Sequence, residues 1–285
     1  MMSARFLTVV LERAFNMRDG FGREIDYMRI SVIDSCNLNC YYCNPCDNNE
    51  HCHALNILSV KEVLCIVRAA TRLGIKHFRL TGGEPLLHPQ LDEMVLQIKK
   101  IPGVSSVSLT TNAVLLAQHA KWLKEAGIDS INVSLDTIDA SEYERITKKP
   151  LLEEVKHGIN AAIECGIRVK INVVLTPQTD VVALTRYVAK KGTDIRFIEM
   201  MPVGEGHTNG VEPYKKVIGT LSKLYGEPCR INTEKTKEIN SGNNKRKIPD
   251  NGPAEYYIFP ELGIRVGLIQ AIHGKFCDTC NRIRV

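Results

Sequence analysis

Three cysteines stand close together near the start of the chain, and their spacing could hold an inorganic cluster. Cys36, Cys40 and Cys43 form a CxxxCxxC pattern, with Tyr42 directly before the last thiol. Four-iron clusters are held by cysteine thiolates, usually four of them. Three thiolates leave one iron without a protein ligand, and an open metal position is typical of a site that does chemistry.

The same loop allows two other interpretations. Pairs of cysteines separated by two residues are the usual signature of zinc, and free cysteine is among the most buried residue types. The loop alone therefore leaves an iron–sulfur site, a zinc site and inert packed thiols open. The rest of the chain has to decide between them.

Composition and charge exclude several classes of protein. Of the 285 residues, 44% are hydrophobic and 24% are charged, which is ordinary for a globular protein. The net charge of +5 fits an anionic small molecule at least as well as nucleic acid, and no Lys/Arg run of the kind found in polyanion-binding tails is present. No stretch reaches the ~18 apolar residues of a membrane span. Ten cysteines without a secretory signal predict a reducing compartment, the cytoplasm.

Strand-like and helix-like segments alternate from residue 27 to residue 200, and this rhythm predicts βαβ units on a parallel sheet. The strands are fewer than the eight of a closed TIM barrel. We therefore expect an α/β fold, an open (β/α)6 partial TIM barrel with a C-terminal extension that closes the barrel mouth. The expected strands are residues 27–33, 76–80, 104–109, 130–135, 169–175 and 194–198.

The chain divides into three expected parts. Residues 1–20 are an N-terminal extension, residues 21–205 are the partial barrel, and residues 206–285 are a C-terminal region with a second Cys motif. Within this last part we expect a helix over 213–225, a polar loop over 230–253 and a hairpin of strands 255–259 and 263–268.

Polar residues follow the expected strands one after another. In parallel α/β folds the working residues lie on loops at the carboxyl ends of strands. Gly82 and Gly83 would let the backbone approach a ligand closely, and Glu84 is placed to accept a hydrogen bond from an ammonium group. Each cluster is weak alone, because GGEP can be only a tight turn and Ser134 or Asp136 can simply cap a helix. The segments expected on this rim are the Cys loop, TGGEP (81–85), TTN (110–112), SLD (134–136) and EMM (199–201).

The Cys loop followed by GGEP resembles the radical S-adenosylmethionine (SAM) superfamily. The resemblance implies that the three thiolates hold a [4Fe-4S] cluster whose open iron binds the amino and carboxylate groups of SAM. The reduced cluster then cleaves SAM to a 5′-deoxyadenosyl radical, which abstracts a hydrogen atom. By the same resemblance, the SAM site is lined by Tyr42, Gly82, Gly83, Ser134 and Met201, with Glu84 near the methionyl ammonium group.

A closer resemblance covers the chain from Gly22 to Val285. Successive blocks are similar to the GTP cyclases of molybdenum-cofactor biosynthesis, which convert GTP to a cyclic pyranopterin precursor. The resemblance implies a radical SAM lyase with GTP 3′,8-cyclase activity, an electron donor and a downstream pyranopterin-forming enzyme as partners, and allows a homodimer. The blocks are GREIDYMRISVIDSCN, RLTGGEPLL, LTTNAVLL, INVSLDTID, VKINVVL, IRFIEMMPVG and FCDTCNRIRV.

The closer resemblance also implies a second cluster and a GTP site. Cys277 and Cys280 match two ligands of a cluster whose open iron holds the purine. Arg282 and Arg284 alternate onto one face beside this Cys pair and are the expected catalytic residues. A triphosphate needs several guanidinium and ammonium groups, although any one arginine could instead be a solvated surface charge. The expected GTP contacts are Arg29, Arg79, Thr110, Lys170, Arg282 and Arg284, with Arg196 on the cavity wall.

Three departures from the family pattern stand out. The family's third C-terminal cysteine lies beyond the CNRIR block, so we expect the sequence to be a fragment. His77 stands where the family usually has a lysine near the phosphates, which predicts a weaker or pH-dependent contact. The loop after the first cluster contains an unusual set of residues that could bind an extra metal or be incidental: Cys46, His51, Cys52 and His53, with Asn44 replacing the family's usual Met.

Two further functions stay open on the sequence alone. A radical SAM enzyme could act on another nucleotide or on a peptide, since peptide-modifying enzymes share the barrel and the first Cys loop. A zinc-stabilised binding module without catalysis would leave TGGEP, SLD and EMM without a reason.

Overall fold

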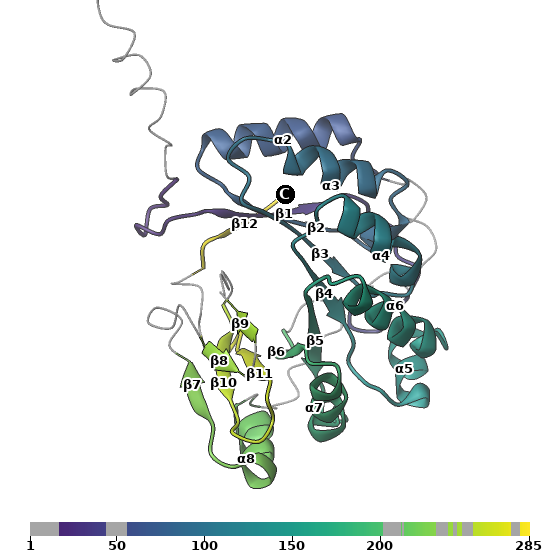
Figure 1. The fold of residues 1–285 in the computed structure, drawn as a ribbon, viewed down its shortest axis with the longest axis vertical. Coiled ribbons are helices and arrows are strands. Elements are labelled where there is room, and N and C mark those ends of the chain that lie inside the picture. Colours follow the sequence, from purple (N-terminus) through teal and green to yellow (C-terminus); the bar gives the residue numbers. More distant parts are fainter. Residues whose placement is uncertain are drawn as a thin grey trace, which may run out of the picture.

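The structure is a computed structural model that describes residues 17–43, 56–201, 212, 214–231, 239–241, 244–246, 253–274 and 280–285. Within these residues, parallel strands alternate with helices, and the strands form an open curved sheet with the helices outside it (Figure 1). This arrangement confirms the predicted partial barrel.

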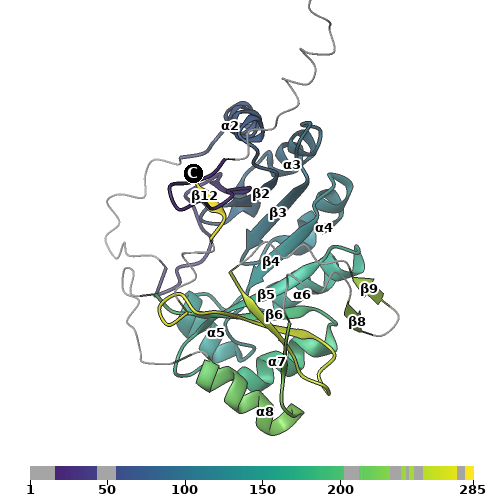
Figure 2. The same ribbon diagram turned by 90° about the vertical axis from the view of Figure 1, so that its left-hand side faces the viewer.

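Strands β1 to β6 form the centre of the sheet in sequence order, and each pairs in parallel with the next. Their bounds are β1 Tyr27–Ser31, β2 His77–Thr81, β3 Ser106–Thr111, β4 Ser130–Ser134, β5 Val169–Leu175 and β6 Asp194–Glu199. The helices between them are α2 Val60–Arg72, the short 3₁₀ helix η1 Pro85–Leu87, α3 Leu91–Lys99, α4 Leu116–Glu125, α5 Ala140–Thr147, α6 Leu152–Glu164 and α7 Val181–Lys190. In Figure 2, α2, α3 and α4 follow one another along the outer side of the sheet.

The two faces of the strands differ in chemistry, because side chains alternate along a strand. On β2, Phe78 and Leu80 are 0% exposed and belong to the hydrophobic core. His77 and Arg79, which alternate with them along the strand, line a cavity on the other face. The sheet is therefore packed against helices on its outer face and is polar on its inner face.

Local sequence signals explain where several helices begin. Ser59 accepts a hydrogen bond from the Glu62 amide, and the Glu62 carboxylate accepts one from the Ser59 amide, so a capping box begins α2. At α5 and α7, the carboxylates of Asp139 and Asp180 each accept a hydrogen bond from a backbone amide of the first turn.

C-terminal residues extend both edges of the central sheet. On one side β11 (Arg265–Ile269) pairs in parallel with β6, and β10 (Glu255–Ile258) and β7 (Cys229–Ile231) follow antiparallel. On the other side β12 (Arg282–Arg284) pairs in parallel with β1. The expected hairpin is thus confirmed as β10 and β11. These strands belong to the barrel's own sheet, so the sheet marks no boundary between the two parts. The expected division at residues 205 and 206 therefore stays a prediction.

The region around residues 213–253 differs in part from expectation. The expected helix consists of a π-helix, η2 (Tyr214–Ile218), that continues into α8 (Gly219–Tyr225). The expectation of a loop over 230–253 is wrong, because β7 reaches into it and β8 (Ile239–Ser241) pairs with β9 (Asn244–Arg246). A Gly- and Asn-rich pattern is typical of loops and equally of tight hairpin turns, which explains the error.

Several expectations fall on residues outside the described ranges. These are most of the N-terminal extension, the set Cys46, His51, Cys52 and His53, and Cys277. Among the described residues, no helix has the length and apolar character that a membrane crossing requires.

Candidate active site

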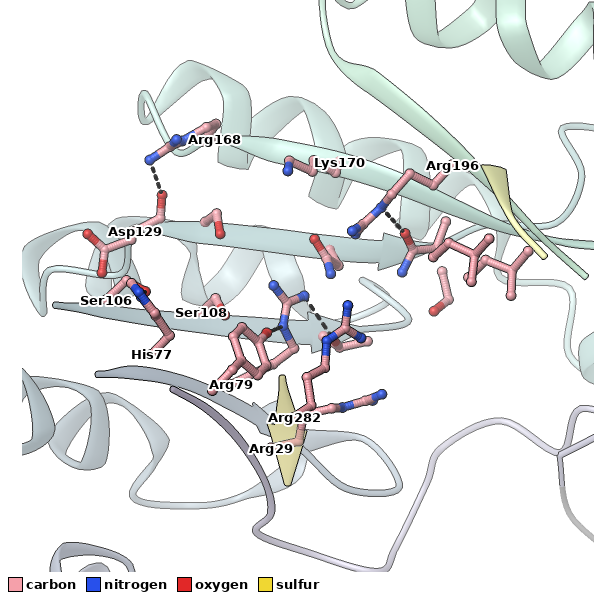
Figure 3. A pocket seen from close by; sticks show the side chains of 18 of the residues that line it. Arg29, His77, Arg79, Ser106, Ser108, Asp129, Arg168, Lys170, Arg196 and Arg282 are labelled. Atoms are coloured by element: carbon pink, nitrogen blue, oxygen red, sulfur yellow. Dashed lines mark hydrogen bonds between the residues drawn. The ribbon is translucent and has the colours of Figure 1, made fainter. Parts of the chain in front are cut away.

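A cavity of about 470 Å³ lies on the inner face of the sheet. Its walls come from every strand from β12 at one edge of the sheet to β11, so most of the open barrel surrounds it. Figure 3 shows that basic side chains from five different strands point into this space. Those labelled there are Arg29 on β1, Arg79 on β2, Lys170 on β5, Arg196 on β6 and Arg282 on β12.

The register of the edge strands places like charges side by side. Arg29 is directly opposite Arg79 on β2 and opposite Arg284 on β12. Side chains opposite each other in neighbouring strands lie within reach of one another, and like charges there repel. The expected GTP-contacting residues Arg29, Arg79 and Arg282 are thus brought together in the cavity, with Arg284 exposed at the end of the same row.

The electrostatics of this row indicate an anion site. Burial, followed by repulsion from Arg284 and Arg79, lowers the pKa of Arg29 to about 10. Burial also lowers the pKa of Arg282. The Nε atoms of Arg29 and Arg282 and one terminal nitrogen of Arg196 are buried without an acceptor among the described residues. Buried donors without acceptors are costly, so this wall is suited to a ligand that brings negative oxygens.

Two residues that the sequence analysis missed hold the arginines in place. The Tyr27 hydroxyl accepts a hydrogen bond from Arg79 Nε, and the Tyr27 ring lies 5.4 Å from the Arg282 guanidinium. Asn172 Oδ1 accepts from Arg196 Nε at 2.9 Å. Tyr27 and Asn172 stand two residues from Arg29 and Lys170 on their strands, and this even spacing was the signal that could have found them.

Gly267 on β11 makes room for the far wall. It lies opposite Arg196, and a Cβ at this position would be 2.8 Å from Arg196 Cγ and 2.9 Å from the Tyr256 ring. The Lys170 ammonium group lies 5.9 Å from the centre of the same ring. A side chain at Gly267 would therefore push Arg196 away from its place on the cavity wall and displace the Tyr256 ring.

The three thiols of the first Cys loop lie close together at the carboxyl ends of the strands. The Cys43 amide donates to the Cys40 carbonyl at 2.9 Å, which makes the loop compact. Burial, together with Asp136 and the two other thiols, raises the pKa of Cys40 to about 12. Burial is also the main reason that the pKa of Cys36 is raised. Such thiols become thiolates when a bound metal supplies positive charge.

This donor set is of the kind that holds a four-iron cluster, whose ligands are cysteine thiolates. Among the residues that the structure describes, no three Cys, His, Asp or Glu side chains gather tightly enough to hold one metal ion. A four-iron cluster is a larger object, and its thiolate ligands stand further apart than those of zinc. The remaining described thiol of the expected second set, Cys280, is half-buried just before β12.

The GGEP turn supports the Cys loop directly. The Gly83 amide donates to the Ile33 carbonyl and the Glu84 amide to the Ser35 carbonyl, both at 2.7 Å. A Cβ at Gly82 would lie 2.2 Å from the Ile33 oxygen, and one at Gly83 would lie 2.2 Å from the Ser35 oxygen. The close approach that we expected toward a ligand is therefore made by the chain's own backbone, and ligand contact by these glycines stays a prediction.

Glu84 fastens this turn to the end of β3. Its side chain is 1% exposed, and its oxygens accept from the Thr111 hydroxyl at 2.7 Å, the Asn112 amide at 2.7 Å and the Leu86 amide at 3.0 Å. The Asn112 side chain in turn donates to Asn37 at 2.7 Å and to Cys36 Sγ at 3.8 Å. Contact of Glu84 with a methionyl ammonium group stays a prediction.

The other expected SAM-site residues lie on the same rim. Tyr42 donates its hydroxyl hydrogen to Asp136, whose other oxygen accepts from the Val174 amide. Burial raises the pKa of Asp136 to about 6. Ser134 and Asp136 line the main cavity and also a small adjoining one of about 30 Å³ beneath the Cys loop. Met201, at the end of β6, is 52% exposed.

Comparison with known families defines the class of protein first. Residues 30–184 match the family described as Radical SAM superfamily, and residues 193–285 match the family described as Molybdenum Cofactor Synthesis C. The first match covers more than half of the chain. The chain is therefore a member of the radical SAM superfamily.

Curated relatives narrow the assignment. The GTP 3′,8-cyclase of Clostridium perfringens strain SM101 is 37% identical over 272 residues, which are 94% of this chain and 80% of that protein. The GTP 3′,8-cyclase of Pelotomaculum thermopropionicum is 37% identical over 276 residues, which are 94% of this chain and 81% of that protein. Within the superfamily, the chain belongs to the GTP 3′,8-cyclase family.

Solved structures share the fold at lower identity. SuiB of Streptococcus suis is 18% identical with a TM-score of 0.57, over 70% of this chain and 46% of SuiB. Native anSMEcpe with bound AdoMet is 19% identical with a TM-score of 0.56, over 70% of this chain and 60% of that protein. The chain spans less than two thirds of both solved proteins, and the likeness supports the open-barrel fold.

Proposed function

We propose that this chain is a radical SAM enzyme that converts GTP to the cyclic pyranopterin precursor of molybdopterin, a GTP 3′,8-cyclase. The observation that carries the proposal is the group of buried arginine nitrogens that have no acceptor within the described part of the chain, on a cavity wall of this family's fold. A nucleoside triphosphate offers many negative oxygens, which bind guanidinium groups by charge-assisted hydrogen bonds.

The residues present fit the cofactors of the family. Cys36, Cys40 and Cys43 would hold a [4Fe-4S] cluster, and the rim formed by Tyr42, Gly82, Gly83, Glu84, Ser134 and Met201 would hold SAM beside it. When bound, cluster and SAM supply a carbon-centred radical able to take a hydrogen atom from a sugar. The placement of Ser134 and Asp136 in the walls of both cavities supports a direct passage between this rim and the substrate space.

The side chains of the cavity would bind and orient the nucleotide. Arg29, Arg79 and Arg282 are gathered around Tyr27 and can neutralise a triphosphate from one side of the cavity. Lys170 and Arg196 lie on the opposite wall and can fix the other end of the substrate. Such fixed charges hold the sugar and base near one another before reaction, which is the positioning that an intramolecular bond between them requires.

Arg282 and Arg284 are the expected catalytic residues, and their surroundings differ. Arg282 lines the cavity, whereas Arg284 is exposed at the far end of β12 beside Arg29. The different surroundings support substrate contact by Arg282 and charge support from Arg284. A second cluster on Cys277 and Cys280, an electron donor, a downstream pyranopterin-forming enzyme and a homodimer also belong to this proposal.

The alternative functions have less support. Solved relatives of the same fold include SuiB bound to its precursor peptide, at 19% identity, and this likeness concerns the fold. A peptide would not supply several closely spaced negative oxygens to the arginine row, whereas another nucleotide would. A zinc-stabilised binding module is disfavoured by membership of the radical SAM superfamily.

The test is anaerobic reconstitution of the chain with iron and sulfide, followed by iron counting and EPR with SAM and GTP. The proposal predicts an EPR signal that SAM perturbs, and conversion of GTP to a cyclised product detected by mass spectrometry. Conversion of a different nucleotide with GTP untouched would favour the nucleotide alternative. Zinc in place of iron would contradict radical chemistry altogether.

A further inference from the structure

Asp26 stands directly before β1 and fastens the C-terminal strand to the amino end of the sheet. Its Oδ1 accepts a hydrogen bond from Asn281 Nδ2 at 2.6 Å. The Tyr27 amide donates back to the Asn281 carbonyl at 3.3 Å. Asn281 immediately precedes β12, which carries Arg282 into the cavity. Asp26 is thus the side-chain link between the barrel and the strand that supplies this arginine.

The same residue also contacts His77, which lines the cavity. The Asp26 carbonyl accepts from the His77 amide at 3.0 Å, and Asp26 Oδ2 lies 4.0 Å from His77 Nε2. The other ring nitrogen of His77, Nδ1, is 2.8 Å from the Ser106 hydroxyl oxygen. His77 and Ser106 both line the cavity. The imidazole therefore lies between the Asp26 carboxylate and the Ser106 hydroxyl, and Figure 3 shows His77 beside Ser106.

The charges around His77 oppose one another. Burial is the largest effect and lowers the pKa of His77, and the neighbouring Lys76 lowers it further, while Asp26 and Asp129 raise it. The ring is thus mainly neutral near neutral pH in the empty cavity. A bound polyanion would favour the protonated ring, because opposite charges at close range stabilise the charged form.

The link to Asn281 matters because β12 is short. It spans Arg282–Arg284 and pairs with β1 alone at the edge of the sheet. A slip of one residue would exchange the faces of the strand and turn Arg282 out of the cavity in favour of Ile283. A side-chain contact next to the strand is an effective way to fix its register.

We propose that Asp26 is a positioning residue of the substrate cavity with two arms, one that sets the register of β12 through Asn281 and one that orients His77 toward the bound anion. The inference rests on the proposed function, since it takes the anion to be the triphosphate of GTP. It concerns how this chain arranges its basic side chains, and Asp26 itself does not reach the reacting atoms.

Variants at Asp26 and Asn281 separate the two arms. Asp26→Asn keeps an oxygen that can accept from Asn281 but removes the charge that faces His77. Asn281→Ala removes the strand contact and leaves the charge, and Asp26→Ala removes both. Affinity for GTP is measured by anaerobic equilibrium dialysis at about pH 8 and about pH 6, on either side of the usual histidine range.

The expected pattern differs between the variants. Asn281→Ala weakens GTP binding by about tenfold at both pH values, the scale of one lost charged hydrogen bond. Asp26→Ala weakens it by about tenfold at the higher pH and by more at the lower pH, because it also removes the charge that favours the protonated His77 ring. Asp26→Asn binds almost as wild type at the higher pH, but it gains less affinity than wild type when the pH is lowered. The double variant Asp26→Ala/Asn281→Ala binds no more weakly than Asp26→Ala at the higher pH, because both changes break one contact.

A matched control lies on the outer face of the barrel. Asp92 Oδ2 is 3.8 Å from His119 Nδ1, a carboxylate–histidine pair between α3 and α4 that does not line the cavity. Asp92→Asn should leave GTP affinity and its pH dependence unchanged. A loss equal to that of Asp26→Asn would show that the pH effect is general, and would overturn the His77 arm.

Amide hydrogen exchange over residues 281–285 tests the strand arm without any nucleotide. Asp26→Ala and Asn281→Ala should speed exchange at β12, while Asp26→Asn should not. If wild type fails to bind GTP, the proposed function is wrong, and unchanged exchange in the Ala variants would separately contradict the strand arm. If wild type binds GTP and all three variants bind equally well at both pH values, the positioning role is overturned.

Discussion

The guanidinium group of Arg29 is surrounded by other positive charges on the cavity wall. Arg79 and Arg284 are opposite it on the two neighbouring strands, and its Nε atom is buried without an acceptor among the described residues. The two like charges and the buried Nε atom without an acceptor each raise the free energy of the protein before a ligand binds. The cost is relieved when an anion enters, so part of the binding energy is built into the folded state before the ligand arrives.

Replacement of Arg29 by methionine should separate stability from binding. The variant loses a repelled, partly buried cation, so the free energy of unfolding without nucleotide should stay equal or rise by up to ~1 kcal/mol. GTP affinity should fall by about tenfold or more, the scale of one charged hydrogen bond. Urea unfolding and equilibrium dialysis measure the two effects. Arg145→Met, at a surface pair with Glu142, is the control and should leave GTP affinity unchanged.

Asp136 predicts a pH dependence of the metal-free protein. Its folded pKa of about 6 lies above the ordinary value of 3.8, so the folded state favours the protonated carboxyl. The stabilisation from this proton is complete below the ordinary value and is lost as the pH rises through about 6. Asp136→Asn, which mimics the neutral acid, should flatten the pH profile between these values by on the order of 2 kcal/mol in urea unfolding. An unchanged profile would mean that Asp136 is ionised throughout.

At the scale of elements, the sequence predicted the parts whose signal is local. Strands β1 to β6 and their helices alternate between apolar and polar positions, and capping residues such as Ser59 mark the helix starts. Strand β12 has no such signal, because Arg-Ile-Arg becomes a strand only by pairing with β1, far away in the sequence. The packing of Gly83 against the Cys loop was missed for a related reason. A glycine indicates that some atom lies close to the backbone, but it does not identify which atom.

The contact between the GGEP turn and the Cys loop can be tested at Gly83. A Cβ there would lie 2.2 Å from the Ser35 oxygen, and backbone cannot yield as a flexible side chain can. Gly83→Ala should lower the free energy of unfolding by about 2 kcal/mol and reduce the iron bound at the first Cys loop. Gly219→Ala in α8 is the control, because an added Cβ there would meet no described atom within 4 Å outside its own helix. This variant should be neutral or slightly stabilising. Equal iron binding in both variants would show that the loop tolerates the displacement.

At the scale of the whole molecule, the net charge is modest, but positive charge is concentrated at the cavity. The chain carries only +5 overall, yet basic side chains from β1, β2, β5, β6 and β12 face the same cavity. The open barrel makes this possible, because its inner face is polar and both of its edges are completed by C-terminal strands. The chain segments that complete the sheet are therefore the same ones that bring Arg282 and Ile269 to the cavity.

This concentration of charge predicts how affinity depends on the ligand's phosphates and on salt. GTP should bind more tightly than GDP, and GDP more tightly than guanosine, because each removed phosphate leaves arginine donors without a partner. At about tenfold per phosphate, GDP binds about tenfold more weakly than GTP, and guanosine, which lacks two further phosphates, about a hundredfold more weakly than GDP. Raising the ionic strength should weaken GTP binding far more than guanosine binding, since salt screens charge and hardly affects stacking. Equilibrium dialysis of the three ligands at two salt concentrations measures both trends. Equal affinity for all three would place recognition on the base and sugar, and would leave the buried nitrogens of Arg29, Arg196 and Arg282 that lack an acceptor among the described residues without a ligand to explain them.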